Sequence, residues 1–302
     1  VFGDAPYGHP LSGTPESIAA IKRDDIRGLH QSYYRPDNAM LVIAGDIRAD
    51  EAFKIAERFF SDWKKPTAPL ASTGTMVSKT DGLGAKPRVV VIDKPDAGQA
   101  AVVLTRQGIS RTDKDYFSGV VANSVLSGYS GRLNQEIRIK RGLSYGAGSQ
   151  LEVRRDVGPF AASAQTKNES GADVAALLSG ELGRLATGQL PETELVPRKA
   201  VVIGGFGRAL ETGGGLVNQI ASLALYGLSL DEINTYINRV QAVTATDVQR
   251  FAGGRLDTKG ASIIIVGDAK QFLPALKKQF GENVEVIPVS ELNLNSASLR
   301  RG

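Results

Sequence analysis

The chain has 302 residues, of which 42% are hydrophobic and 23% are charged. This length leaves room for about two domains of ~150 residues each, and the composition excludes disordered and fibrous proteins. The 36 basic and 32 acidic side chains give a formal net charge of +4, a bias too small over this length to favour nucleic-acid binding.

Side chains that bind metals or act as nucleophiles are scarce in this sequence. There is no cysteine, which excludes disulfides, thiolate metal sites and cysteine nucleophiles and leaves the redox compartment open. The only two histidines, His9 and His30, are too far apart for an HExxH or HxxEH zinc-binding helix. We therefore expect this chain to bind no catalytic metal by itself. We also expect no membrane span, because no apolar run approaches the ~18 residues that one needs.

The first 65 residues predict two helices, a strand and a further helix. Thr14 followed by Pro15 is typical of a helix N-terminus, and Asp24 is a candidate cap for a second helix. The uninterrupted apolar run 39–44, which ends at a glycine, predicts a buried strand. Apolar residues at helical spacing then predict a helix over about 50–63.

Residues 66–87 are rich in proline, glycine, serine and threonine and show no periodicity, which predicts a linker between domains. Beyond the linker, residues 88–290 are predicted to form a complete domain, and residues 291–302 a tail. The elements expected within that domain are strands at 88–93 and 99–107, helices at about 113–127 and 131–140, a long hairpin over 142–167, helices over 172–251, a strand within 260–269 and a short helix ending near Phe280.

Residues 21–46 and 243–268 align without a gap, at an offset of 222 residues. The matched pairs are Asp25 with Asp247, Ile26 with Val248, Leu29 with Phe251, Ala39 with Ala261, Ile43 with Ile265, Gly45 with Gly267 and Asp46 with Asp268. Unrelated helix–turn–strand units ending in Gly-Asp can look alike, but the shared register of cap, strand and exit favours a duplication. The repeat then predicts that 1–65 ends a first copy, most of which precedes Val1. The chain would accordingly be a processed protein or a fragment.

Three motifs invite catalytic or ligand-binding interpretations that their context does not favour. The string GLSYG matches a nucleophile elbow with Ser144 as the nucleophile, but that fold requires a later histidine and both histidines come earlier. The glycines at 204–207 and 213–215 follow no strand, so they indicate flexible helix connections rather than a phosphate loop. The cluster IRIKRG, at 137–142, is more typical of a solvated helix face than of a nucleic-acid site.

Arg138 and Tyr145 form the pair in this region with the clearest chemical potential. They are seven residues apart, and Gly142 between them is a candidate helix C-cap, so a helix can end and turn into a strand that brings both side chains together. A guanidinium and a phenol are two hydrogen-bond donors suited to a substrate carbonyl or a developing oxyanion. From the spacing alone, an exposed arginine and a half-buried tyrosine without a function remain the commoner outcome.

Several strings are similar to the pitrilysin and insulinase group of zinc peptidases, which includes the mitochondrial processing peptidase and its bacterial relatives. They are PYGHPLSGTPESIAAIKRDDIRGLHQSYYRPDNAMLVIAGDI, LSGYSGRLNQEIRIKRGLSYG, QLPETELVPRK, ALYGLSLDEI and VTATDVQRF, and together they cover most of residues 1–282. The resemblance implies an α+β fold of tandem pitrilysin-type α/β domains, each an antiparallel-rich mixed sheet covered by helices. Residues 1–65 would be the C-terminal part of a first peptidase-like domain, and 88–290 a complete second one without zinc.

The resemblance also implies a function and its residues. In this group the zinc site is an inverted HxxEH helix with a downstream glutamate, in the portion of the first domain that would precede Val1, so no zinc ligand falls on this chain. Relatives carry an arginine and a tyrosine, seven apart in the second domain, that clamp the peptide substrate, and here these correspond to Arg138 and Tyr145.

The chain would thus be the C-terminal region, or an inactive partner subunit, of a zinc metallopeptidase, inactive by itself. Zinc is expected in the complete assembly only. The expected partners are a peptide substrate and a homologous zinc-bearing subunit or the chain's own missing N-terminal half, in some cases as a dimer. The alternative is a non-catalytic structural subunit of the same fold, like the core proteins of the respiratory chain. A periplasmic or secreted location fits the bacterial relatives.

Overall fold

The computed structural model describes residues 1–73 and 86–301. These residues form two compact units. The larger holds the described residues within 1–10, 76–203 and 237–302, and the smaller holds those within 11–75 and 204–236. Of the expected linker, residues 74–85 lie outside the described residues, and 66–73 are neither helix nor strand.

A six-stranded mixed sheet is the centre of the larger unit. Its strands are β1 (Val89–Asp93), β2 (Ala100–Gln107), β3 (Ala147–Leu151), β4 (Pro159–Thr166), β5 (Ser262–Gly267) and β6 (Val284–Pro288), in the order β3-β4-β2-β5-β1-β6. The pairs β3–β4, β4–β2 and β2–β5 are antiparallel, whereas β5–β1 and β1–β6 are parallel. The predicted antiparallel-rich mixed sheet is confirmed, and β6 is a strand that the sequence did not predict.

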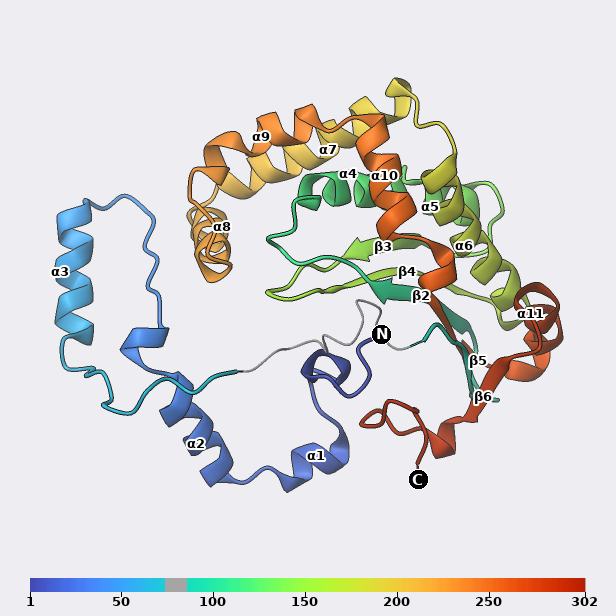
Figure 1. Ribbon diagram of the computed structural model, residues 1–302, viewed down its shortest axis with the longest axis horizontal. Helices are drawn as coiled ribbons and strands as arrows, with labels where there is room; N and C mark the ends of the chain where they lie inside the picture. Colours follow the sequence, from blue (N-terminus) through green and yellow to red (C-terminus); the bar gives the residue numbers. More distant parts are fainter. Residues whose placement is uncertain (74–85, 302) are drawn as a thin grey trace. The chain divides into compact units, whose positions relative to one another are not determined.

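One face of this sheet is covered by helices. Helices α4 (Tyr116–Leu126), α6 (Gly171–Thr187) and α10 (Ala245–Arg255) pack against one another, and α6 lies on β2 (Figure 1). Alternate residues of β2 and β4, among them Leu104 and Phe160, point into this layer and are almost completely buried. Each such side chain contributes about 1.5–3 kcal/mol through the hydrophobic effect. The alternation of buried and less buried residues along β2 and β4 therefore shows which face of the sheet carries the core.

The helix expected near 131–140 takes an unusual form. Helix α5 (Arg132–Asn134) continues directly into a π-helical turn, η3 (Gln135–Ile139). Three more helices with residues in the larger unit are α7 (Glu192–Leu210), α9 (Glu232–Ala242) and α11 (Leu273–Phe280). The last of these ends at the predicted Phe280.

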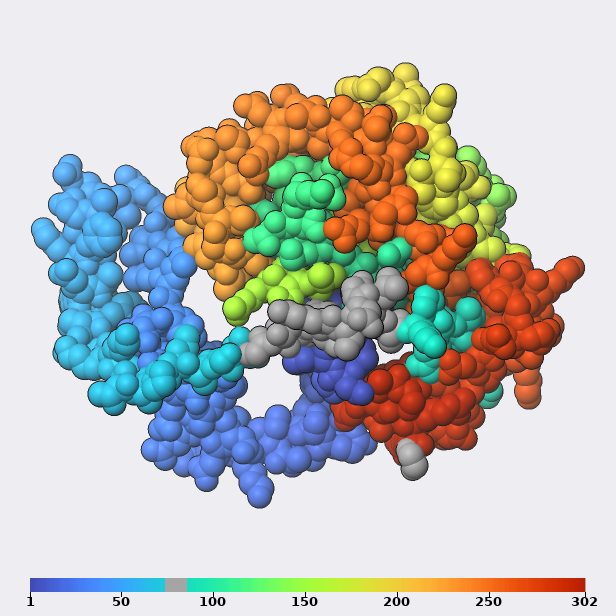
Figure 2. All heavy atoms as spheres, in the orientation of Figure 1, coloured from blue at the N-terminus to red at the C-terminus, as the bar shows by residue number. Residues whose placement is uncertain are grey.

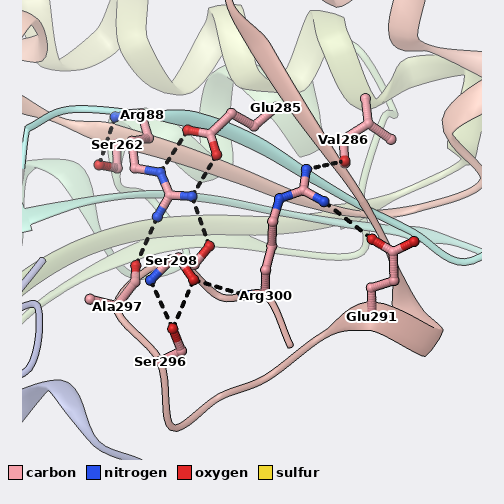
Figure 3. A network of polar contacts seen from close by, with 9 residues as sticks. All are labelled: Arg88, Ser262, Glu285, Val286, Glu291, Ser296, Ala297, Ser298 and Arg300. Atoms are coloured by element: carbon pink, nitrogen blue, oxygen red, sulfur yellow. Dashed lines mark hydrogen bonds and ion pairs between the residues drawn. The ribbon is translucent and has the colours of Figure 1, made fainter. Parts of the chain in front are cut away.

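Both chain ends lie against the sheet of the larger unit. Val90, Ile92 and Ile287 form an apolar cluster with Leu292 and Leu299, so the expected tail packs on β1 and β6. The Arg88 guanidinium donates to both carboxylate oxygens of Glu285, at 2.7 and 2.6 Å, and to the carbonyls of Ala297 and Ser298 (Figure 3). In Figure 2 the dark blue N-terminal residues lie beside the dark red C-terminal segment, where the Ala297 amide donates to Asp4.

The smaller unit contains α1 (Pro15–Ala20), α2 (Arg23–Tyr33), α3 (Ala49–Phe60) and α8 (Gly213–Leu225). The predicted Thr14 cap is confirmed, because its hydroxyl accepts from the Ser17 amide at 3.3 Å. The prediction that Asp24 caps the second helix is wrong. Helix α2 begins at Arg23 and its N-cap is Lys22, two residues before Asp24, and the carboxylate of Asp25 accepts from the Lys22 amide at 2.8 Å.

The prediction of a buried strand at 39–44 is also wrong. These residues are neither helix nor strand, and Met40, Leu41 and Ile43 are 60%, 55% and 43% exposed. A strand requires a hydrogen-bonded neighbour, and within the described ranges no strand pairs with this run. The apolar composition was correctly recognised, but the partner that would make it a strand is not among the residues described.

Candidate functional site

Arg138 lies on the π-helical turn η3, close to where the helix ends. The Lys140 amide donates to the Gln135 carbonyl at 2.9 Å, five residues back, which is the hydrogen bond that defines a π turn. Gly142 has a φ of 63°, and its amide donates to the Arg138 carbonyl at 2.9 Å. Gly142 therefore ends the helix in the left-handed conformation, as its sequence position predicted.

The Arg138 guanidinium lies over the Tyr129 ring, 5.6 Å from its centroid. Its basic neighbours behave differently, because Lys140 and Arg141 both pair with Glu136, at 2.9 and 2.6 Å. The hydrogen bond from Lys140, followed by the charges of Lys140 and Arg141, holds the pKa of the Glu136 carboxyl below its usual range. Within the described part of the chain, no carboxylate pairs with Arg138. The half-buried guanidinium thus rests on an aromatic face with its donors available to a ligand.

Tyr145 lies on the segment that leads from Gly142 into β3 and is 90% exposed. This segment is held by its neighbours: the Ser144 hydroxyl donates to the Gly146 carbonyl at 2.6 Å and accepts from the Gly146 amide. The hydroxyl of Thr166 on β4 donates to the Leu143 carbonyl, also at 2.6 Å. The backbone on both sides of Tyr145 is therefore fixed, while its phenol projects into solvent.

Buried Asn134 joins the two sides of this site. Its side-chain amide donates to the Tyr129 carbonyl at 2.6 Å, and its side-chain oxygen accepts from the Ala147 amide at 3.4 Å. Asn134 thereby connects the ring under Arg138 with the first residue of β3. Sequence reasoning missed Asn134, Tyr129 and Thr166, because each acts through contacts between segments that the local pattern does not reveal.

Arg138 and Tyr145 lie on either side of the turn at Gly142, and the expectation that this turn brings their side chains together stays a prediction. No hydrogen bond or ring contact joins their two side chains within the described residues. A pair without a function was expected to have an exposed arginine and a half-buried tyrosine. The structure shows the opposite, because the arginine is half-buried and the tyrosine is exposed. The turn therefore presents two hydrogen-bond donors, an exposed phenol and a guanidinium supported by an aromatic ring.

A cavity of about 420 Å³ adjoins Tyr145 on the sheet face opposite the helices. Its lining comes from β2, β4 and the start of β3, and it consists of Gln99, residues 101–103, residues 144–148 and residues 163–165. None of these residues carries a charged side chain. The cavity is therefore neutral, and Tyr145 forms part of its wall.

The other motifs acquire structural roles. The Ser144 hydroxyl bonds Gly146, and His30 stacks on Tyr34 in the smaller unit with 5.1 Å between ring centroids, so no Ser–His pair supports the nucleophile elbow in the described residues. The glycines at 204–207 lie inside helix α7, so their interpretation as a helix connection is wrong. Gly213 begins α8, where the Thr212 hydroxyl accepts from the Gly215 amide at 3.0 Å.

The donor set does not fit a zinc ion. Within residues 1–73 and 86–301, no three histidine or carboxylate side chains come together in a way that could hold a metal. No helix in these ranges has the length and apolar content to cross a bilayer. The part of the chain that is described therefore supplies hydrogen-bond donors, and no step of catalysis through a metal can be assigned to it.

The fold and the candidate site define an α/β domain with a helix-covered mixed sheet, a half-buried arginine and an exposed tyrosine. Residues 20–200, more than half of the chain, match the family described as the peptidase M16 inactive domain, and the chain belongs to that family. It is 28% identical over 278 residues to an uncharacterized zinc protease of Streptomyces coelicolor, covering 89% of this chain and 59% of that protein. The chain thus spans about three fifths of such relatives.

Solved structures show the same fold. A peptidase M16 inactive domain from Pseudomonas fluorescens matches with a TM-score of 0.75 and 24% identity, over 86% of this chain and 61% of that one. A chain of complex III from Candida albicans matches with a TM-score of 0.72 and 15% identity, over 90% of this chain and 66% of that one. The similarity to zinc peptidases stated from the sequence is thereby confirmed at the level of family and fold.

Proposed function

We propose that this chain is the C-terminal region or the inactive partner subunit of a zinc metallopeptidase. In this role it binds a peptide and positions it for hydrolysis at a zinc site on another domain or subunit. The observation that carries the proposal is the pair Arg138 and Tyr145, presented on a fixed turn with free donors. The similarity to the Streptomyces coelicolor zinc protease supports the class of reaction.

Arg138 and Tyr145 would act by hydrogen bonding to the peptide backbone. The planar guanidinium, held over the Tyr129 ring, presents a permanently charged fork to a carbonyl oxygen. The Tyr145 hydroxyl supplies a second donor. Because Gly142, Asn134 and Thr166 fix the backbone between them, little conformational entropy remains to be lost when the peptide binds. Donors placed before the reaction begins are the arrangement that stabilises a developing oxyanion.

The smaller unit supports the proposal that a zinc-bearing domain accompanies this chain. Its apolar residues Ile26, Leu29 and Leu41 are 61%, 57% and 55% exposed. Their counterparts in the internal repeat, Val248, Phe251 and Ile263, are at most 5% exposed under neighbouring helices and strands. A domain of the same architecture, upstream in the polypeptide or on a partner subunit, would cover the exposed copy as the larger unit covers its own.

The alternative is a structural subunit without a role in peptide hydrolysis. The fold that the chain shares with complex III of Candida albicans supports this alternative. The two functions differ in what they require of Arg138 and Tyr145. A structural subunit has no need of an exposed phenol, so its loss would leave assembly and activity unchanged.

The test uses the complete assembly, prepared as a polypeptide that includes the zinc-bearing domain or by combining this chain with a zinc-bearing homologous subunit. Hydrolysis of a quenched fluorescent peptide is measured for the wild type and the double variant Arg138→Ala/Tyr145→Phe. We expect kcat/KM to fall on the order of 10²-fold if these groups stabilise the oxyanion. Arg141→Ala, on the same turn but paired with Glu136, is the matched control and should retain activity. Wild-type turnover by the double variant would overturn the proposal.

A further inference from the structure

The neutral cavity beside Tyr145 lies on the part of the sheet that neither helices nor chain ends cover. Val103 on β2 is directly opposite Ser163 on β4, and Ala101 is opposite Gln165. Residues opposite one another in an antiparallel pair point to the same face. Because their neighbours Val102 and Leu104 are buried, these four point away from the core. The C-terminal segment contacts β1 and β6 instead and contributes nothing to the cavity wall.

The size and chemistry of the cavity limit what it can hold. A volume of about 420 Å³ falls within the range of ~300–1,000 Å³ that is usual for ligand pockets. The wall offers no charged group, so an ionised side chain entering it would lose its hydration without gaining a counter-charge. Ala101, Val103 and Ser163, which line the cavity, have short side chains, and the volume accommodates the side chain of a leucine or phenylalanine. The cavity therefore favours an uncharged, apolar occupant.

We infer that this cavity receives an uncharged side chain of the bound peptide and that Ser163 and Val103 determine which side chains fit. The inference rests on the proposed function, because it requires a peptide to be held by Tyr145. Residues 144–148 form both the turn that carries Tyr145 and one wall of the cavity. A peptide bound to the phenol thus has a side-chain position directly next to the cavity. The chain contributes to substrate selection as well as to substrate holding.

Two substitutions at Ser163 test the inference, because this residue is exposed on the sheet and its replacement disturbs no core packing. Ser163→Phe fills the cavity, and Ser163→Glu places a negative charge in it. Binding of labelled peptides that differ at one position, carrying Leu, Phe, Lys or Gly, is measured by fluorescence anisotropy with this chain and by kcat/KM with the complete assembly. Gln150→Phe is the control, at an exposed position of β3 opposite Ala161 and outside the cavity.

We expect Ser163→Phe to weaken the Leu and Phe peptides roughly 10-fold or more while sparing the Gly peptide, which is the discrimination typical of one filled apolar pocket. Ser163→Glu should shift the preference toward Lys, and Gln150→Phe should change nothing. Equal binding of all four peptides by the wild type, or unchanged preference in both Ser163 variants, would overturn the inference. If that happens while Arg138→Ala/Tyr145→Phe still lowers kcat/KM on the order of 10²-fold, the proposed function stands and the inference is overturned. A changed preference in the Ser163 variants together with wild-type turnover by the double variant would show that the cavity selects side chains but that Arg138 and Tyr145 do not hold the peptide, which would overturn the proposed function and the part of the inference that rests on Tyr145.

Discussion

The helix and the 3-10 turn have the same local structure in the two copies of the internal repeat, but opposite burial. Helix α2 and helix α10 coincide at the offset of 222 residues, as do the short 3-10 turns η2 (Pro36–Asn38) and η5 (Thr258–Gly260). In the second copy Val248 and Phe251 are buried, whereas the matching Ile26 and Leu29 are largely exposed. Helices and turns therefore form from local sequence in both copies, while burial depends on what the rest of the chain supplies.

The apolar segment that follows each helix also shows that structure depends on neighbouring segments, because it is a strand in only one of the two copies. In the second copy it becomes β5, which is hydrogen-bonded to β1 on one side and β2 on the other. In the first copy the equally apolar run 39–44 has no strand beside it among the residues described, and it is not a strand. A strand forms only when a second segment pairs with it. Apolar composition therefore identifies a candidate strand, and the presence of a neighbouring strand determines whether it forms.

Hydrogen exchange should show the largest contrast between the copies. The amides of Ile263–Ile265 lie in the middle of the sheet, and their exchange should require opening that approaches the global free energy of unfolding, about 5–15 kcal/mol. The amides of 41–43 should exchange almost as fast as those of an unfolded chain. Exchange measured by mass spectrometry with peptide-level resolution provides the comparison. Equal protection in the two segments would show that the first copy is already covered.

Hydrogen exchange also tests the proposal that a zinc-bearing domain or subunit covers the first copy. Addition of the zinc-bearing domain or subunit should protect 41–43 and leave Ile263–Ile265 unchanged, because among the described residues no strand lies beside 41–43, whereas β5 has a strand on each side. If a partner binds without protecting the amides of 41–43, it does not supply a strand that pairs with this segment, and this part of the proposal is contradicted. A structurally unrelated protein of similar size and charge is the control.

Truncation of matched apolar side chains should give the next largest difference between the copies, measured as the change in the free energy of unfolding. Phe251→Ala removes a buried ring and should destabilise the larger unit by about 3–5 kcal/mol in urea unfolding. Leu29→Ala, at the matching exposed position, should change stability by less than about 0.5 kcal/mol in the same chain. A cost of several kcal/mol for Leu29→Ala would mean that α2 is packed against something in solution.

Asn134→Ala tests the hydrogen bonds that support the candidate site rather than the repeat. Its effect on the free energy of unfolding should be smaller than that of Phe251→Ala. The substitution leaves the Tyr129 carbonyl and the Ala147 amide without their shared partner, at a cost of about 1–3 kcal/mol. Because Tyr129 supports the Arg138 guanidinium, turnover by the complete assembly should fall mainly through kcat. Phe251→Ala, which destabilises the same unit at a buried position of α10 outside the candidate site, is the control for general destabilisation. An unchanged kcat in a folded Asn134→Ala protein would show that the site does not depend on this bridge.

Particular residues show how far the sequence alone predicts this molecule. The Thr14 cap, strands β1 and β2 and the Gly142 end of the π turn follow from local chemistry, and all were predicted. The absence of a strand at 39–44, the extra strand β6 and the uninterrupted α7 depend on contacts between distant segments and were not predicted. At the candidate site, Arg138 and Tyr145 are expected from spacing and resemblance, and their role stays a prediction. Tyr129, whose ring lies under the Arg138 guanidinium, and Asn134, which links Tyr129 to Ala147, were missed because nothing in the nearby sequence distinguishes them.

The helix caps of the two copies should show the smallest difference in their contribution to the free energy of unfolding, and the one most specific to pH. In the second copy the Thr244 hydroxyl donates to the Asp247 carboxylate at 2.6 Å, and the Thr244 amide donates to it at 2.9 Å. In the first copy Lys22 stands in place of the threonine, so Asp25 receives only the amide hydrogen bond, at 2.8 Å. The hydrogen bond from the Thr244 hydroxyl is the main reason that the pKa of the Asp247 carboxyl is lowered below its usual value.

A carboxyl with a lowered pKa in the folded state stabilises the protein fully above its unfolded pKa, near 4, and loses that contribution as the pH falls through the folded value. Asp247→Asn should therefore cost about 1 kcal/mol at pH 7, a typical value for a lost cap, and progressively less below pH 4. Asp25→Asn should cost less at pH 7, because one hydrogen bond to that carboxylate is absent from the start. Urea unfolding of both variants from pH 7 to pH 3 checks this order, and a larger effect at Asp25 would contradict the difference between the two caps.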